Sequence, residues 1–340
     1  MSHPDGGAQR RITVARPGAL GDTLLALPTL ALLRRWAPDA HLTFIARGDC
    51  LPLALASGLA DIGWPWDLPD WSVLFTDAPD MAPTPLAQEA LAHADVVILW
   101  AADTDGQLAC RVASLGARQA LVAPTQPPDD TPIHVALWLA QTLRSLGAPA
   151  VSLAELVALT PALTAPPEAT TQAEALWRRL WPARQQAPSR VIALHPGAGS
   201  PRKRWPADRF AELAALASAA GYAPLLLAGE ADAQALRETQ DALAVRGVAP
   251  LRARDLPGAT LAALLRRCVG YVGNDSGVSH LAGLVGTPTV AIFGPTDPAR
   301  WAPLGPRTLA LRSPDAQLAA VSAADVWRAL LSIMPVPDGE

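Results

Sequence analysis

The sequence predicts an α/β protein with two doubly wound domains, each built on a parallel sheet that is covered by helices. The chain has 340 residues, a length that suggests about two domains. Half of its residues are hydrophobic and its mean hydropathy is +0.20, which is enough for sizeable buried cores. Short apolar runs alternate with helical patterns, as expected where parallel strands are buried on both faces.

The first half of the chain supplies the first domain, which we place at residues 11–165. Its apolar runs predict buried strands at Ile12–Ala15, Leu42–Ala46, Val96–Trp100 and Ala120–Ala123. Amphipathic or apolar stretches predict helices at Thr23–Trp36, Pro85–Ala92, Gln107–Leu115 and Ile133–Leu146. Strands separated by helices favour parallel pairing, so we expect a Rossmann-like fold here.

Proline-rich sequence then interrupts the pattern. Pieces such as "LTPALTAPPEATT" surround one predicted helix at Gln172–Leu180, and we assign residues 166–188 to a linker region. The alternation restarts in a second Rossmann-like domain at residues 189–333. Its predicted strands are Val191–His195, Pro224–Ala228, Gly270–Gly273, Thr289–Phe293 and Thr308–Leu311. Its predicted helices are Ala207–Ala220, Ala231–Leu243, Thr260–Cys268, Ser276–Val285 and Ala323–Ser332. We expect the two domains to face a cleft, with ligands beyond the carboxyl ends of the strands.

The charges divide unevenly between the two halves. Residues 1–165 carry 9 basic and 16 acidic side chains, a balance of −7, whereas residues 166–340 carry 18 and 15, a balance of +3. The second half is therefore the better host for an anionic ligand. No basic patch indicates a nucleic-acid partner. Lys203 is the only lysine among 27 basic residues.

Cysteine use and the termini indicate a cytoplasmic, soluble protein. The three cysteines have neither metal-site spacing nor a disulfide pattern, which fits a reducing compartment. The polar start "MSHPDGGAQRR" is unlike a signal peptide. The longest run without charges, Ser276–Thr296, contains four glycines and two prolines, and it is typical of a core segment rather than a membrane span.

The stretch "ARPGALGDTLL" is a strand, a glycine turn and the start of a helix. Gly18 and Gly21 let the backbone approach a ligand closely, and the helix start offers free N–H groups. Asp22 stands at that start, where it could be a helix N-cap, a phosphate-loop residue or a catalytic base. The turn does not have the G-x-G-x-x-G spacing, and no acidic residue follows about 20 positions later, which disfavours a dinucleotide oxidoreductase.

A second candidate loop is "LHPGAGSPRKRWPADRF", residues 194–210. Gly199 and Ser200 precede Lys203, and together they could grip a phosphate, although the spacing of a Walker loop is absent. The alternative is a solvated basic loop.

The richest segment is "YVGNDSGVSHLAGLVGTPTVAIFGPTDPARW", residues 271–301. A strand ends in Gly273-Asn274-Asp275, and Ser276 and Gly277 open a helix whose N–H groups and dipole suit a diphosphate. His280 lies one turn into this helix, where a packed core residue is the competing interpretation.

Two pairs of carboxylates follow strands. Glu230 and Asp232 could accept hydrogen bonds from ribose hydroxyls or cap the next helix, and the sequence does not choose between them. Asp103 and Asp105 form a D-x-D motif, a spacing that can hold a metal–diphosphate pair. Because the motif has only three residues and lies in the acidic first half of the chain, we interpret it as a chance match.

Four stretches, in order, resemble glycosyltransferase family 9, the ADP-heptose:lipopolysaccharide heptosyltransferase family with the GT-B fold. They lie between Ile12 and Leu331 and read "GALGDTLLALPTLALLRR", "HPGAGSPRKRWPADRFAEL", "GNDSGVSHLAGLVGTPTVAIFGPTDPARW" and "VSAADVWRALL". The resemblance implies that the first domain binds an acceptor and the second a nucleotide-sugar donor. Two features depart from the family: the first domain is acidic, and its turn reads "RPGALGD" rather than a serine-bearing version.

The resemblance also implies roles for particular residues. The general base falls on Asp22, and the lysine that holds the donor phosphates falls on Lys203, with Gly199 and Ser200 lining the same pocket. The diphosphate cradle falls on Asp275, Ser276 and Gly277, with His280 nearby, and a ribose-binding acid falls near Glu230 or Asp232.

The resemblance therefore implies inverting, metal-independent transfer of a sugar, heptose from ADP-heptose, to a lipopolysaccharide or other glycan acceptor. No cofactor is expected besides the nucleotide-sugar substrate, and contact with the membrane is at most peripheral, at the inner face of the cytoplasmic membrane. The alternatives are a nucleotide-sugar epimerase on the same scaffold and a catalytically silent glycan- or nucleotide-binding module.

Overall fold

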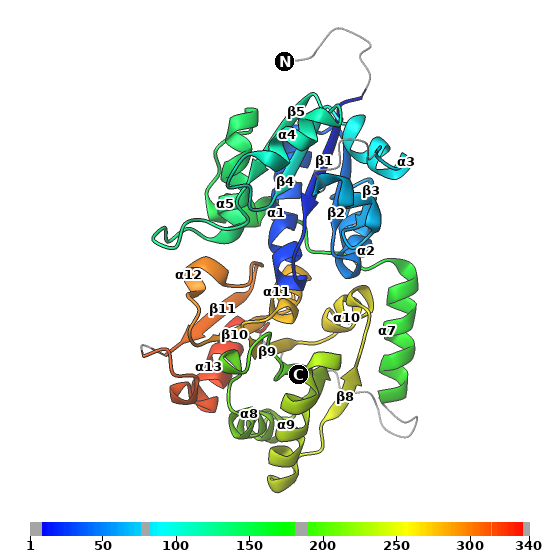
Figure 1. Ribbon diagram of the computed structural model, residues 1–340. Coiled ribbons are helices and arrows are strands. Elements are labelled where there is room, and N and C mark those ends of the chain that lie inside the picture. Colours follow the sequence, from blue (N-terminus) through cyan, green and yellow to red (C-terminus); the bar gives the residue numbers. More distant parts are fainter. Residues whose placement is uncertain (1–8, 76–81, 181–189, 314, 336–340) are drawn as a thin grey trace. The chain divides into compact units, whose positions relative to one another are not determined.

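The computed structural model describes residues 9–75, 82–180, 190–313 and 315–335. The chain folds into two compact units, Met1–Thr160 and Pro161–Glu340. Each unit holds one parallel sheet flanked by helices (Figure 1). The prediction of two parallel-sheet α/β domains is confirmed.

The sheet of the first unit has the strand order β3-β2-β1-β4-β5, and every neighbouring pair is parallel. Its strands are β1 (Arg11–Arg16), β2 (His41–Ala46), β3 (Ile62–Pro65), β4 (Val96–Trp100) and β5 (Gln119–Ala123). The chain continues from β1 to one side of the sheet and from β4 to the other. The switch point in strand order therefore lies between β1 and β4, the place where such sheets bind ligands at their carboxyl edge.

The helices of the first unit cover both faces of this sheet. They are α1 (Leu20–Trp36), α2 (Leu51–Ala56), α3 (Pro85–Ala87), α4 (Gln107–Ser114), α5 (Val135–Thr142) and α6 (Leu153–Leu159), with short turns η1 (Gly48–Cys50), η2 (Pro69–Leu74), η3 (Gln88–Ala92) and η4 (Leu143–Leu146). Helix α1 is buried without a break from Thr23 to Leu33, because it packs on α5 and α6 as well as on the sheet. It therefore holds the turn before it firmly against β1.

The sheet of the second unit has the order β11-β10-β9-β6-β7-β8, again with parallel neighbours throughout. Its strands are β6 (Val191–His195), β7 (Ala223–Ala228), β8 (Leu251–Arg254), β9 (Gly270–Asn274), β10 (Thr289–Phe293) and β11 (Thr308–Arg312). Strands β6, β9 and β10 are buried along their whole length. The switch point of this sheet lies between β6 and β9, so the segments that follow His195 and Asn274 share it.

The helices of the second unit are α7 (Pro167–Leu180), α8 (Ala207–Ala219), α9 (Ala233–Val245), α10 (Gly258–Leu265), α11 (Gly277–Leu284), α12 (Pro298–Trp301) and α13 (Ala323–Ile333), with turns η5 (Pro201–Lys203), η6 (Glu230–Asp232) and η7 (Leu318–Ala320). Helices α8, α9 and α13 enclose an apolar core with one face of the sheet; at its centre lie Leu194, Phe210 and Val272. Trp205 extends this core into the loop after β6. The core thus fixes one end of the basic loop.

The predicted strands form as expected, but two edge strands were not predicted. Strand β3 has only four residues and ends in a proline, and β8 alternates apolar and arginine residues, so neither shows the long apolar run of a central strand. Helix α2 lies in "LPLALA" and α6 in "LAELVAL", and both were also missed because they are short.

The region assigned to a linker contributes a helix to the second unit. Helix α7 begins at Pro167, five residues before the predicted start, and packs against α10. Its Trp177 is buried, and the guanidinium of Arg267 lies 5.0 Å from the ring centroid of Trp177. The rest of the assigned linker, 181–188, lies outside the described residues. Across the described ranges, no helix is both long and apolar enough to cross a membrane.

Candidate active site

The candidate residues of the second unit gather at the carboxyl edge of its sheet. Because all six strands are parallel, the segments after β6, β7, β9 and β10 leave from the same edge. Lys203 comes from the first of these segments, Glu230 from the second, Asp275 from the third and Thr296 from the fourth. The fold therefore brings together residues from motifs that are far apart in the sequence.

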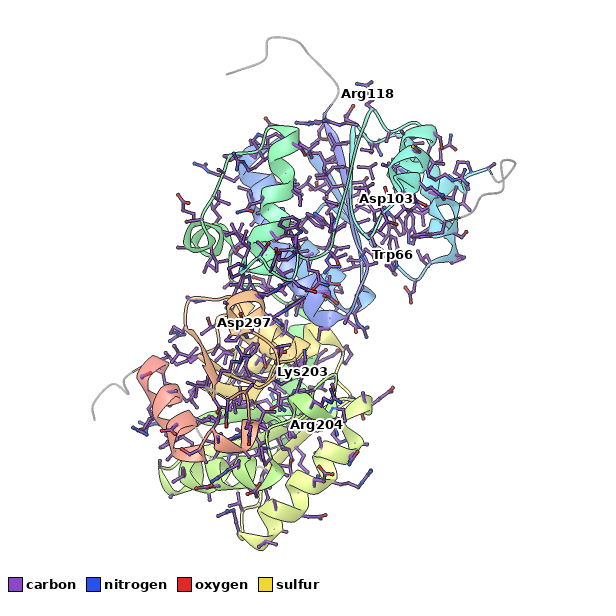
Figure 2. All side chains as sticks on the ribbon, turned by 60° about the vertical axis from the view of Figure 1, so that its left-hand side comes forward. Trp66, Asp103, Arg118, Lys203, Arg204 and Asp297 are labelled. Atoms are coloured by element: carbon purple, nitrogen blue, oxygen red, sulfur yellow. The ribbon has the colours of Figure 1, made fainter. Side chains whose placement is uncertain are left out.

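Lys203 is held by a buried carboxylate. Its Nζ donates to Oδ2 of Asp275 at 2.7 Å, and the hydroxyl of Thr296 donates to the same oxygen at 2.5 Å. The side chain of Asp275 is 8% exposed, whereas that of Lys203 is 31% exposed. A buried carboxylate requires a counter-charge, so Asp275 orders a cation that is still within reach of a ligand. Figure 2 shows Lys203 beside Arg204 in the second unit.

Helix α11 begins next to this ion pair. Ser276 is its N-cap residue with extended backbone angles, and its side chain makes no capping hydrogen bond. Within the described part of the chain, the N–H groups of Gly277 and Val278 have no acceptor. Free N–H groups and the positive end of the helix dipole favour an anion at this point. Gly277 has no side chain and is half-buried, so its backbone is partly open to solvent.

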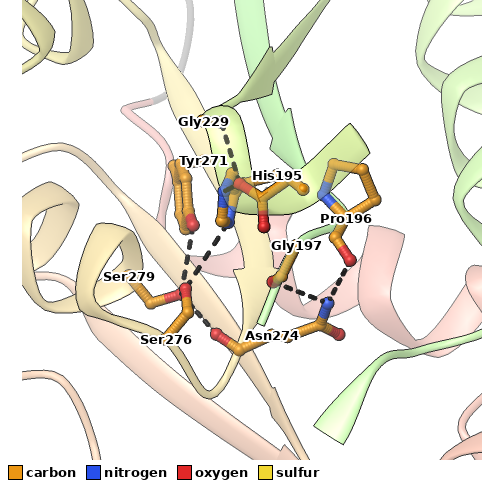
Figure 3. A network of polar contacts seen from close by, with 9 residues as sticks. His195, Pro196, Gly197, Gly229, Tyr271, Asn274, Ser276 and Ser279 are labelled. Carbon is orange, nitrogen blue, oxygen red and sulfur yellow. Dashed lines mark hydrogen bonds and ion pairs between the residues drawn. The ribbon is translucent and has the colours of Figure 1, made fainter. Parts of the chain in front are cut away.

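Asn274, the last residue of β9, braces the loop that carries Lys203. Its Nδ2 donates to the carbonyls of Pro196 at 2.8 Å and Gly197 at 3.1 Å, as Figure 3 shows. Its Oδ1 accepts from the backbone N–H of Trp205 at 2.8 Å. Asn274 is fully buried, and it therefore fixes both ends of the loop from 196 to 205. Sequence analysis placed Asn274 at a strand end but gave it no role.

His195 and Asp232 form a buried pair behind the loop. His195 Nε2 lies 3.0 Å from Asp232 Oδ2, and the N–H of Gly229 donates to the same oxygen at 2.8 Å. A Cβ on Gly197 would lie 1.9 Å from Oδ1 of Asp232, so only glycine fits there. Burial opposes the ionised form of Asp232, but His195 and the other donors outweigh it, and the pKa of Asp232 is lowered. Asp232 is thus committed to internal contacts.

The remaining candidates of the second unit differ in accessibility. Glu230 is exposed, two residues before the committed Asp232. Gly199 is exposed with open space around its Cα, and Ser200 accepts a hydrogen bond from the N–H of Arg202 at 3.4 Å. His280 is 4% exposed, as the packed-core interpretation predicts.

A chain of hydroxyl groups links the helix start to the sheet. Ser279 Oγ donates to the carbonyl of Asn274 at 2.5 Å and lies 3.1 Å from the hydroxyl of Tyr271 (Figure 3). Ser276 Oγ lies 3.5 Å from both Ser279 Oγ and His195 Nδ1, which is long for a hydrogen bond. The Ser276 hydroxyl is therefore weakly held by the protein and can turn toward a ligand.

In the first unit, Asp22 lies in the first turn of α1. The N-cap of this helix is Ala19, so Asp22 is not the N-cap that was considered but the third helical residue. Its Oδ2 accepts from the N–H of Ala19 at 2.9 Å, and its Oδ1 accepts from Nη2 of Arg16 at 3.2 Å. Its side chain is 31% exposed. Gly21 lies in the same turn, and Gly18 precedes it with a φ of +139°.

Asp103 and Asp105 are occupied by helix α4. The two carboxylate oxygens of Asp103 accept from the N–H groups of Leu108 and Ala109, each at 3.0 Å. Asp105 accepts from the N–H of Gln107 at 3.3 Å. The D-x-D therefore has a local structural explanation at the start of α4.

Comparison with known proteins agrees with this architecture. The family model for glycosyltransferase family 9 (heptosyltransferase) matches residues 144–328. Lipooligosaccharide heptosyltransferase 2 of Haemophilus influenzae is 33% identical over 144 residues, which cover 40% of each chain. The chain therefore spans about two fifths of the length of this curated relative.

Two solved structures share the fold over nearly the whole chain. A glycosyl transferase family 9 protein from Veillonella parvula matches with a TM-score of 0.77 and 22% identity, covering 95% of this chain and 97% of that one. The Escherichia coli ADP-heptose lipopolysaccharide heptosyltransferase II matches with a TM-score of 0.69 and 18% identity, covering 95% and 98%.

Two parallel-sheet α/β units that match these solved structures define a protein of the GT-B fold class. The family model covers more than half of the chain. The chain belongs to glycosyltransferase family 9 (heptosyltransferase).

The buried pair behind the loop gives a prediction about stability. We expect Asp232→Asn to lower the free energy of unfolding at neutral pH, because His195 and the N–H of Gly229 lose a charged acceptor. Since the pKa of Asp232 is lowered from its ordinary 3.8, the carboxylate stabilises the fold above that value. This contribution fades as the pH falls through the lower folded value. Urea unfolding at a series of pH values should show the gap between native protein and variant closing below about pH 4.

Glu230→Gln is the matched control, since it changes a neighbouring carboxylate that is exposed. It should leave the unfolding curve almost unchanged. A gap for Asp232→Asn that stays constant into the acid range would contradict this account.

Proposed function

We propose that this protein is an inverting glycosyltransferase that moves heptose from ADP-heptose to a lipopolysaccharide or other glycan acceptor, without a metal ion. The observation that carries the proposal is the ordered Lys203 beside the free N–H groups of helix α11. A cation and a helix start at one place provide what a diphosphate leaving group needs. Membership of family 9 and the relatives named above support heptose as the sugar and ADP as its carrier.

The donor diphosphate occupies the second unit. Its oxygens accept hydrogen bonds from Lys203 Nζ, from the N–H groups of Gly277 and Val278 and from the loosely held Ser276 hydroxyl. Asp275 does not contact the anion directly, because like charges repel; it holds Lys203 in place instead. Gly199 and Ser200 line the same loop, and the exposed Gly199 lets backbone approach the ligand.

The ribose contact falls to Glu230 rather than Asp232. Both residues follow β7, but the carboxylate of Asp232 is already occupied by His195 and by the N–H of Gly229. Glu230 is exposed at the same turn and can accept hydrogen bonds from the ribose hydroxyls. Of the two carboxylates after β7, Glu230 is therefore the one that is available to a ligand.

The reaction is a single displacement with Asp22 as general base. Asp22 removes the proton from an acceptor hydroxyl as that oxygen attacks the anomeric carbon. The bond from this carbon to the diphosphate breaks on the opposite face, and the bonding electrons leave with the nucleoside diphosphate. Lys203 and the α11 N–H groups stabilise the departing charge. No step requires a cofactor, and the enzyme is expected to act in the cytoplasm.

Nucleotide binding tests the donor site. In a thermal-shift series with ADP, UDP, GDP and CMP, ADP should raise the melting temperature most, since stabilisation follows RT ln(1 + [L]/Kd). Lys203→Ala should raise the Kd for ADP about tenfold or more, because it removes charged hydrogen bonds to the diphosphate. Arg202→Ala is the matched control from the same loop and should keep the native Kd. A larger rise in melting temperature with another nucleotide would show that ADP is not the carrier of the donor sugar. An unchanged Kd for ADP in Lys203→Ala would show that Lys203 does not bind the diphosphate.

The ribose assignment has its own test. Native protein should bind ADP more tightly than 2′,3′-dideoxy-ADP, because Glu230 accepts from the ribose hydroxyls. Glu230→Ala should lose most of this difference, about 1 kcal/mol for each hydrogen bond removed, while its affinity for the dideoxy compound stays native. Glu238→Ala, an exposed carboxylate further along α9, is the control. A full ADP preference in Glu230→Ala would refute the assignment.

Transfer kinetics test the base. Asp22→Asn should lower kcat by about 10²–10⁴-fold, since it removes general-base catalysis, while the Kd for ADP stays native. Asp39→Asn, an exposed carboxylate after the same helix, should transfer at the native rate. Sugar-modified product that forms without any acceptor would instead support an epimerase. Near-native turnover in Asp22→Asn would show that another group is the base.

A further inference from the structure

Arg16 is a buried charge that the proposed reaction has not yet used. It is the last residue of β1 and is 3% exposed, which is rare for an arginine. Its Nη1 donates to the carbonyl of Pro17 at 2.7 Å, and its Nη2 donates to Asp22 Oδ1 at 3.2 Å. Its buried Nε has no hydrogen-bond partner among the described residues.

Burying Arg16 in this way destabilises the folded state. Removing a guanidinium from water costs free energy, and an unsatisfied buried N–H adds to that cost. Burial lowers the pKa of Arg16, and the charge and hydrogen bond of Asp22 only partly offset this effect. Methionine or leucine at the end of a buried strand would cost nothing of this kind. A buried charge with an unsatisfied N–H group is expected mainly where function requires it.

The carboxylate of Asp22 is held by Arg16 and by a second hydrogen-bond donor in the same turn. The N–H of Ala19 holds Oδ2, while Arg16 holds Oδ1. Gly18 leaves the room that this orientation needs, because a Cβ there would lie 2.8 Å from Asp22 Cβ and 2.9 Å from Oδ2. The positive φ of Gly18, +139°, also favours glycine. Two hydrogen bonds within the same turn therefore orient the carboxylate, in the space that Gly18 leaves.

The orientation leaves the carboxylate able to react. An ionised carboxylate offers about four acceptor positions, and the hydrogen bonds from Ala19 and Arg16 occupy two of them. The side chain of Asp22 remains 31% exposed, whereas Arg16 is enclosed. A substrate hydroxyl can thus reach Asp22, but Arg16 can act only through Asp22.

We propose that Arg16 is a positioning residue for Asp22: its buried guanidinium holds the carboxylate in the orientation from which it takes the acceptor proton. The inference rests on the proposed function, since it assigns Asp22 as the base. It adds a second residue to the catalytic turn and accounts for the arginine, the first glycine and the aspartate of "RPGALGD". Arg16 contributes to turnover and not to donor binding.

Kinetics of three variants test the proposal. Arg16→Met keeps the length of the side chain and removes its charge, and it should lower kcat by about 10²-fold, the cost of misplacing a catalytic group. The Kd for ADP and the KM for the donor should stay within about twofold of native, because Arg16 is not part of the donor site. Arg16→Lys restores the charge without the two-pronged geometry and should recover part of kcat. Arg11→Met is the matched control: it removes a half-buried arginine, paired with Glu89, at the other end of the same strand.

A double-mutant cycle separates positioning from general structural damage. If Arg16 acts through Asp22, adding Arg16→Met to Asp22→Asn should lower kcat no further. Independent, multiplicative losses would overturn the proposal, and so would native kcat in folded Arg16→Met. Should Arg16→Met fail to fold, Arg16→Lys decides: a lower kcat with native ADP binding supports the proposal, and native kcat overturns it. Native protein without transferase activity would instead mean that the proposed function has failed.

Discussion

The buried carboxylate of Asp275 is the charge around which the site of the second unit is organised. Taking a carboxylate out of water costs several kcal/mol unless a counter-charge and hydrogen bonds replace the solvent. Lys203 and Thr296 supply both, on a single oxygen atom. Because these partners come from the segments after β6 and β10, neutralising one atom at the end of β9 ties three strand ends together. The position of the lysine thus follows from the desolvation of the aspartate.

The first unit uses the same principle with the charges exchanged. In the second unit a buried anion, Asp275, holds a partly exposed cation, Lys203. In the first unit a buried cation, Arg16, holds a partly exposed anion, Asp22. In both pairs the enclosed member cannot reach a ligand, and the accessible member has the sign of charge that the proposed chemistry needs. Each active group is therefore preorganised by a partner that solvent does not screen.

Two glycines and the side-chain amide of Asn274 also help to fix the positions of these groups. Gly18 leaves room for the carboxylate of Asp22, and Gly197 leaves room for that of Asp232. Asn274 replaces water at two carbonyls and one N–H of the lysine loop. The loops that carry the candidate site are thus well supplied with buried hydrogen bonds, which have a stricter geometry than hydrophobic packing.

The sequence by itself determined the two-domain α/β architecture and most of the strands and helices, and it identified three glycine-containing loops as candidate sites. These features depend on local patterns: uniformly apolar runs, helical periodicity, and glycine-rich turns at strand ends. The edge strands β3 and β8 were not predicted, because these short segments lack a uniformly apolar run. Only the tertiary structure decided which charges pair. Lys203 and Asp275 are 72 positions apart, and His195 and Asp232 are 37 apart. Burial at a shared sheet edge, which no local pattern encodes, selects these partners and leaves Glu230 available.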